Sequence, residues 1–195
     1  MQKTSREKII IASMKVFSEK DYEKTKMDMI AKSMKIAKGT LYLYFKSKEE
    51  LFIDVMGYIM KKYEEVVCEA EKYTDSDPKV KLRRLINSTL VFIEKNEKFY
   101  YMLERQMQNI GKSFSEKHFR KMYEGRNKVT GVFCGLIEEG IEKGLIRKIK
   151  PEICAMLLMT MIMSFSRMDL FTTDEEVIKG KSEEILNIFL KGVGK

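Results

Sequence analysis

The spacing of apolar residues constrains the fold of this chain more than any other feature. From residue 5 to the last segment, apolar side chains recur every three or four residues, which is the repeat of an amphipathic helix. No segment keeps the alternation of apolar and polar residues that is typical of half-buried strands, and the chain has no internal repeat. The sequence therefore predicts an all-α fold.

Breaks between the periodic segments divide the chain into about nine helices. Ser47 with Glu50 has the form of a capping box, and Asp77 followed by Pro78 has the form of an N-cap with proline at the first helical position. Thr25 is the expected N-cap of the second helix. The predicted helices are residues 5–19, 27–33, 38–45, 48–73, 78–93, 98–110, 115–144, a segment from 151, and a last segment after the break at 172–174.

Charge is distributed unevenly along the chain. Residues 1–48 hold 12 Lys/Arg and 5 Asp/Glu, a net charge of +7, whereas residues 49–195 hold 25 basic and 24 acidic side chains. A compact basic module on a nearly neutral body is typical of nucleic-acid binding, because neutralising phosphates requires clustered Lys and Arg. A basic segment that only keeps the protein in solution is the alternative, and the helical periodicity and aromatic residues of this segment argue against it.

Several functional classes are disfavoured by composition. With 44% hydrophobic and 34% charged residues, the chain is an ordinary globular protein and is not disordered. The three cysteines, Cys68, Cys134 and Cys154, form no CxxC pair, which favours a reduced, cytoplasmic chain over a disulfide framework. The N-terminus has no apolar h-region, so no signal peptide is expected.

An enzyme is the first alternative from a different functional class. The chain has one histidine, His118, and it lacks a GxSxG motif, a phosphate-binding loop, Rossmann glycines and paired metal ligands. An enzyme would have to use Cys134 or Glu104 with His118, and nothing in their spacing selects them. The sequence therefore predicts no catalytic residue, no metal and no cofactor.

The two C-terminal helices carry the strongest signal for self-association. Residues 153–165 contain no charged side chain, but this stretch is too short for a membrane span, which needs about 20 residues. A helix that is apolar on every face is buried on every face. The last helix adds Ile178, Ile185, Ile188 and Phe189 on one stripe. The predicted assembly is a homodimer through these two helices, with no membrane contact.

Residues 25–45 form two short predicted helices around a tight turn at 34–36, which is a helix-turn-helix. With the segments on either side, this motif resembles the tetracycline-repressor-like (TetR) transcriptional regulators over residues 6–52. The matching features are Ile9, Ala12 and Phe17, Tyr22, Ile30-Ala31, Lys38-Gly39-Thr40-Leu41-Tyr42, Tyr44-Phe45 and Lys46-Ser47-Lys48-Glu49-Glu50-Leu51. Beyond residue 52 only the helical architecture is similar.

The resemblance and the side-chain chemistry together give a candidate DNA-binding surface. Small residues at the start of the recognition helix allow close approach to phosphates, and hydroxyl, phenol and ammonium groups can bind phosphate oxygens. The resemblance places Thr40, Tyr42 and Lys48 on the DNA backbone, Lys38 and Leu43 toward bases, and Tyr44 on either. The full predicted set is Lys26, Lys35, Lys38, Gly39, Thr40, Tyr42, Leu43, Tyr44 and Lys48.

Each of these assignments has a structural alternative, because aromatic and apolar residues also build the core of so small a module. Tyr42 could pack in that core and still project its hydroxyl group. Leu41 and Phe45 are expected to be core residues, and Lys46 a solvated charge.

Three residues depart from the family pattern. Asp21 stands where a glycine usually precedes the tyrosine, so the first helix is expected to close differently. Lys35 stands where the turn usually has glycine, so a non-glycine residue is expected in left-handed geometry. Ala37 replaces the usual Ser or Thr N-cap, which forfeits about 0.5–2 kcal/mol.

The resemblance implies a division into a DNA-binding domain, residues 1–47, and an effector-binding and dimerisation domain, residues 48–195, which begins with the linker helix 48–73. Met and aromatic side chains in the body could line an adaptable apolar pocket, or they could simply fill the core. The predicted ligand-binding residues are Phe99, Met102, Met107, Tyr123, Met159 and Met163.

The sequence thus predicts a cytoplasmic, homodimeric repressor that binds a palindromic operator in double-stranded DNA and is released by a small apolar or aromatic effector. A DNA-binding regulator without an effector, and an activator, are the alternatives.

Overall fold

The computed structural model describes residues 5–102, 126–168 and 175–194. Within these residues every regular element is a helix. The only β-type pairing among them is an isolated bridge between Ile146 and Gly194. The all-α prediction is confirmed. The predicted end of the helix at residue 110, the helix start at Ser115 and the break at 172–174 lie outside the described residues.

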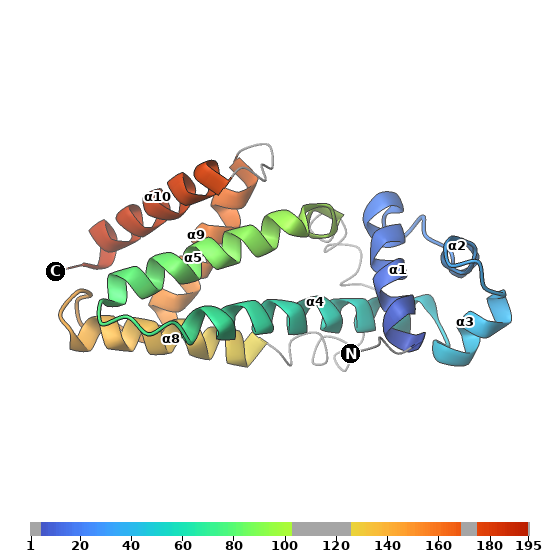
Figure 1. Cartoon of the computed structure of the whole chain (residues 1–195), viewed down its shortest axis with the longest axis horizontal. Helices are drawn as coiled ribbons and strands as arrows, with labels where there is room; N and C mark the ends of the chain where they lie inside the picture. Colours follow the sequence, from blue (N-terminus) through green and yellow to red (C-terminus); the bar gives the residue numbers. More distant parts are fainter. Residues whose placement is uncertain (1–4, 103–125, 169–174, 195) are drawn as a thin grey trace. The chain divides into compact units, whose positions relative to one another are not determined.

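The described residues form two compact units, and α4 contributes residues to both. The first unit consists of residues 5–61 and of the helical segment 97–102. The second unit consists of residues 62–96, 126–168 and 175–194. The functional division into residues 1–47 and 48–195 stays a prediction. The helices are α1 Ser5–Lys20, α2 Met27–Ser33, α3 Lys38–Tyr44, α4 Lys48–Glu71, α5 Pro78–Lys95, α8 Arg126–Glu142, α9 Pro151–Met168 and α10 Glu175–Val193 (Figure 1).

An aromatic cluster forms the centre of the first unit. The rings of Phe17 and Phe52 meet edge to face with their centroids 5.1 Å apart, and Tyr22 lies 4.8 Å from Phe52. Burial of the Tyr22 ring raises the pKa of its phenol. Leu41 and Phe45 have no exposed surface, as predicted for core residues. The ring cluster joins α1 and Tyr22 to the first turns of α4, and α3 contributes the buried Leu41 to the same unit.

Helix caps follow the sequence signals at two of three sites. The Ser47 hydroxyl accepts from the Glu50 N–H at 3.1 Å, and the Asp77 carboxylate accepts from the Lys79 N–H at 2.8 Å. The predicted N-cap at Thr25 is wrong. The N-cap of α2 is Lys26, without a side-chain hydrogen bond, and the buried Thr25 hydroxyl donates to the Asp21 carbonyl at 2.6 Å. A threonine beside a helix start can serve the preceding turn instead.

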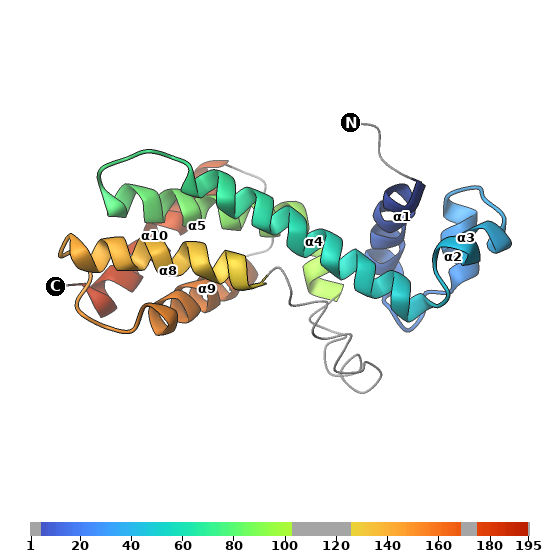
Figure 2. The ribbon, with the colours of Figure 1, turned by 90° about the horizontal axis from the view of Figure 1, so that it is seen from below.

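In the second unit α5 packs against α8, α9 and α10, and α8 and α9 lie side by side (Figures 1 and 2). Leu82, Leu85, Ile86 and Leu90 on α5 have no exposed surface. Between α5 and α10 the Lys181 ammonium lies 3.3 Å from a carboxylate oxygen of Glu94, and both side chains are buried. As far as the structure describes it, the core of this unit is therefore mostly apolar, with the Lys181–Glu94 ion pair inside it.

The C-terminal helices differ from the sequence prediction in which side chains they expose. Ile178, Ile185 and Phe189 are at most 4% exposed in the single chain, so the prediction that they belong to the stripe that forms the dimer interface is wrong. They face α5 or α9, the helices that α10 packs against. Only Ile188 of that stripe is outward, at 46% exposed.

One face of α9 is apolar and open to solvent. Ile153, Met156 and Leu157 are 43–57% exposed, while Leu158 and Ile162 on the opposite face are fully buried. The helix is therefore not buried on every face within one chain. Among the described residues, no helix is both apolar enough and long enough to cross a bilayer.

Candidate nucleic-acid interface

The turn between α2 and α3 is built by hydrogen bonds that close α2. The Ile36 N–H donates to the Ala31 carbonyl at 3.0 Å and the Lys35 N–H donates to the Lys32 carbonyl at 3.1 Å, the pair of bonds of a Schellman motif. Lys35 has φ +56°, so the predicted left-handed residue is confirmed. This geometry directs the chain from α2 into α3.

The end of α1 also has a non-glycine residue in left-handed geometry. Asp21 has φ +63°, the left-handed conformation that glycine adopts most easily, so the expectation of a different closure is wrong. An aspartate tolerates this region better than most residues because its short side chain can bond locally. Ala37 is the N-cap of α3 and makes no side-chain cap hydrogen bond, which agrees with the sequence prediction.

Replacing Lys35 by glycine should raise the free energy of unfolding by about 1 kcal/mol. The left-handed geometry costs a residue with a Cβ about 1–2 kcal/mol, and relief of that cost outweighs the greater flexibility of glycine in the unfolded chain. Chemical denaturation followed by circular dichroism measures the change. Lys46→Gly is the matched control, since Lys46 is also exposed but has no positive φ. A Lys35→Gly variant no more stable than the parent protein would contradict the strain.

Helix α3 presents one buried side chain and a broad exposed face. Leu41 packs inward, whereas Tyr42 is 42% and Leu43 is 84% exposed. Of the predicted DNA-binding residues, seven are exposed and two half-buried. The exposed residues are Lys26, Lys35, Lys38, Gly39, Thr40, Tyr42 and Leu43, and the half-buried residues are Tyr44 and Lys48.

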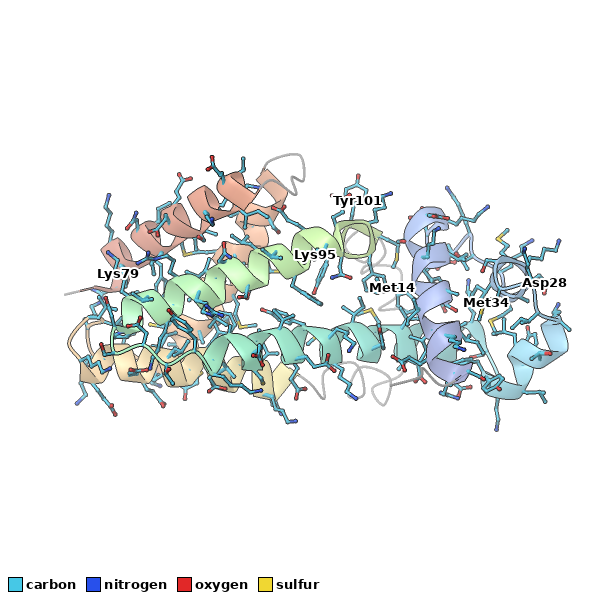
Figure 3. The ribbon with its side chains drawn as sticks, in the orientation of Figure 1. Met14, Asp28, Met34, Lys79, Lys95 and Tyr101 are labelled. Atoms are coloured by element: carbon cyan, nitrogen blue, oxygen red, sulfur yellow. The ribbon has the colours of Figure 1, made fainter. Side chains whose placement is uncertain are left out.

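Two of the predicted lysines already have partners. The Lys38 ammonium lies 2.8 Å from the carboxylate of Asp28 on α2 (labelled in Figure 3), and this pairing raises the Lys38 pKa. The Lys48 ammonium donates to the Tyr22 carbonyl at 2.9 Å and lies 4.2 Å above the Tyr22 ring. An ammonium has three donors, so each lysine can bind a further acceptor.

Arg6 is a central residue of this unit that sequence reasoning missed. Its guanidinium donates to the Asp54 carboxylate at 2.7 Å and to the Tyr44 carbonyl at 2.7 Å, and it lies 4.2 Å above the Phe45 ring. These contacts connect the start of α1 with the end of α3 and with α4. No local pattern could reveal them, because the partners are 38 and 48 residues away.

The predicted effector-binding residues are not brought together in any described cavity. Phe99 and Met102 are 1% exposed and belong to the first unit, whereas Met159 and Met163 are half-buried on α9 in the second. Met107 and Tyr123 lie outside the described residues. The effector site therefore stays a prediction.

Comparison with known proteins identifies a DNA-binding family at the helix-turn-helix and a related domain in the C-terminal part of the chain. The family described as bacterial regulatory proteins, tetR family, matches residues 9–55, and the tetracyclin repressor-like C-terminal domain matches residues 75–167. The chain is 28% identical over 158 residues to the uncharacterized HTH-type transcriptional regulator YhgD of Bacillus subtilis, covering 79% of this chain and 78% of that protein. It is 30% identical to the Fatty acid metabolism regulator protein of Bacillus subtilis over 146 residues, 72% and 70% of the two chains.

Solved structures share the fold. A bacterial regulatory protein in the tetR family from Rhodococcus RHA1 is similar with a TM-score of 0.80 at 21% identity, over 99% of this chain and 98% of that one.

Proposed function

The chain belongs to the tetR family of bacterial regulatory proteins, and from this premise we propose that it is a homodimeric repressor of a palindromic operator, released by a small apolar or aromatic effector. It is a transcriptional regulator and not an enzyme. We place it in the cytoplasm, where its DNA would be. Repression is favoured over activation because occupying an operator is enough to block transcription, whereas an activator also needs a surface that recruits the polymerase.

The exposed face of α3 is the observation that carries the proposal. A leucine that is 84% exposed on a short helix of a basic module buries little apolar surface in its own unit. A Cβ added at Gly39 would meet nothing within 4 Å, so the chain itself does not require glycine there. Both residues are instead explained by a major groove, in which Leu43 meets base edges and Gly39 lets α3 approach the phosphates.

Dimerisation is supported by the apolar surface that a single chain leaves in solvent. Ile153, Met156 and Leu157 are exposed on α9, and Val177 and Ile188 are exposed on α10. Apolar residues concentrated on two neighbouring helices favour a two-fold interface made of two helices from each subunit. Two-fold symmetry in turn favours an operator with two related half-sites.

Selection of bound duplexes from a random DNA pool tests this function. We expect an enriched inverted repeat whose half-sites are separated by about one helical turn or a multiple of it. The pool should be bound at low salt and selected at increasing salt, so that binding to phosphates alone is removed. Enrichment of no sequence, or of a single half-site without its inverted copy, would contradict a dimeric, sequence-specific regulator.

Lys48→Ala should lower the slope of log K against log salt concentration by about 1 for each subunit that loses a phosphate contact. Fluorescence anisotropy of a labelled operator over a salt series measures this slope. A purely structural Lys48, bound only to the Tyr22 carbonyl, would instead give a lower affinity with an unchanged slope. The measurement therefore separates the two roles of this side chain.

The effector is proposed to bind among the Met and aromatic residues predicted from the sequence. The similarity to a fatty acid metabolism regulator makes palmitate a suitable first probe. A ligand that releases operator tenfold must couple to DNA binding by about 1.4 kcal/mol, and DNA must weaken the ligand by the same factor. Titrating palmitate with and without operator tests this, and equal affinities would exclude palmitate as an effector.

A further inference from the structure

A surface cavity lies in the second unit between α5 and α10. Its volume is about 350 Å³, which suits a small molecule. On α5 its residues follow one helix face, and Lys79 and Lys95 mark the two ends of that helix in Figure 3. The cavity is lined by Tyr73, Val80, Arg83, Arg84, Asn87, Lys179, Ser182 and Glu183, none of which belongs to the predicted effector site.

The lining of this cavity is positively charged. Arg83, Arg84 and Lys179 contribute three cations, and Glu183 contributes the one carboxylate, 2.9 Å from the Arg83 Nε atom. The Arg84 guanidinium lies 4.2 Å above the ring of Tyr73, which fixes a cation at an aromatic wall. The cavity lining therefore has a net charge of +2. Residues 49–195 as a whole, in contrast, are nearly neutral.

Two buried polar atoms without a hydrogen bond lie in the same lining. Of three such side-chain atoms in the described residues, Arg83 Nε is a donor and Asn87 Oδ1 is an acceptor. Arg83 Nε is close enough to Glu183 for charge attraction, but the pair lacks hydrogen-bond geometry. The two residues are one turn apart on α5, which places their Cβ atoms about 5–6 Å from each other. Buried polar groups in folded proteins nearly always have partners, so Asn87 Oδ1 indicates a missing donor, and Arg83 Nε can form a hydrogen bond that its charge pair with Glu183 does not supply.

We propose that this cavity binds a small aromatic carboxylate that also carries a hydroxyl group. The carboxylate would accept from Arg83 and be attracted by Arg84 and Lys179, the hydroxyl would donate to Asn87 Oδ1, and the ring would lie against Val80 and Tyr73. Such a ligand supplies both the acceptor and the donor. The site is independent of the operator and of the apolar effector, so its test needs neither.

Isothermal titration of the full-length protein with 3-hydroxybenzoate tests the site, with neutral 3-hydroxybenzamide as the matched probe. We expect binding of the acid, at least about tenfold weaker binding of the amide, and a similar loss with Arg83→Gln and with Asn87→Leu. Arg84→Gln replaces an exposed side chain, so it keeps the test valid if Arg83→Gln does not fold. Arg147→Gln removes an exposed arginine outside the cavity and should leave the affinity unchanged.

The proposal would be overturned by any of three results. The first is no detectable binding of 3-hydroxybenzoate to the parent protein at millimolar concentration. The second is equal affinity for the acid and the amide, which would show that the cations do not contribute. The third is equal affinity in the parent, Arg83→Gln and Arg84→Gln proteins, which would place any bound acid elsewhere on the surface.

Discussion

Replacing Leu157 and Ile188 together by glutamate should give a soluble monomer whose operator affinity is lower by at least about a hundredfold. Both side chains are 46% exposed in the single chain, so the charges do not enter its core. In the proposed dimer four carboxylates would be buried in an apolar interface without partners, which costs several kcal/mol. A monomer has one recognition helix and reads only one half-site.

Sedimentation equilibrium measures the oligomeric state of this variant, and anisotropy with the selected operator measures its affinity. Thr74→Glu, at an exposed position in the turn after α4, is the control for added charge and should stay dimeric. Phe189→Glu is unsuitable as a test, because Phe189 is 3% exposed and a charge there would unfold the chain. A Leu157→Glu, Ile188→Glu protein that remains a DNA-binding dimer would place the interface elsewhere.

Substitutions on α3 should separate affinity from sequence preference. Tyr42→Phe removes a hydroxyl that is proposed to bind a phosphate, so we expect affinity to fall by about 1 kcal/mol per half-site for every duplex. Leu43→Ala removes the proposed apolar contact with base edges. It should change the preference at one position of each half-site by about 1–3 kcal/mol.

Anisotropy against the operator and a panel of single-base variants distinguishes these effects. Tyr73→Phe is the control, since the Tyr73 side chain is 40% exposed, close to the 42% of Tyr42, but lies in the second unit. If Leu43→Ala weakened all duplexes equally while keeping their order, Leu43 would be a backbone contact. If Tyr42→Phe changed the order of the duplexes, the assignment of Tyr42 to phosphate would be wrong.

Local sequence signals were enough for most helix bounds and for the surface of α3. Asp77 with Pro78, and Ser47 before Glu50, specify helix starts through contacts within two or three residues, and the structure has both. The exposed face of α3 also follows locally, because its apolar anchor Leu41 sets which side is inward. The left-handed geometry of Lys35 is predicted by the resemblance, because the family's turn usually has glycine at this position, and the structure has it.

Features that depend on tertiary packing could not be predicted in this way. Whether Ile178 and Ile188 face the core or solvent depends on where α10 meets α5 and α9, and hydrophobicity alone does not distinguish them. The Thr25 hydroxyl could accept from a backbone N–H at the start of α2 or donate to a carbonyl of the preceding turn, and it donates to the Asp21 carbonyl. Arg6 binds partners far along the chain, and the cavity between α5 and α10 joins residues from helices about 100 positions apart.

The ratio of affinities for the selected operator and for a scrambled duplex of the same length and composition tests the central claim most directly. Both duplexes present the same phosphates, so nonspecific attraction to the basic module cancels. The account predicts a ratio of about 10³ or more at physiological salt, with one dimer needed to fill a pair of half-sites. A ratio near one at that salt, with tight binding to both duplexes, would mean that the exposed face of α3 reads no sequence and that the chain is not an operator-specific regulator.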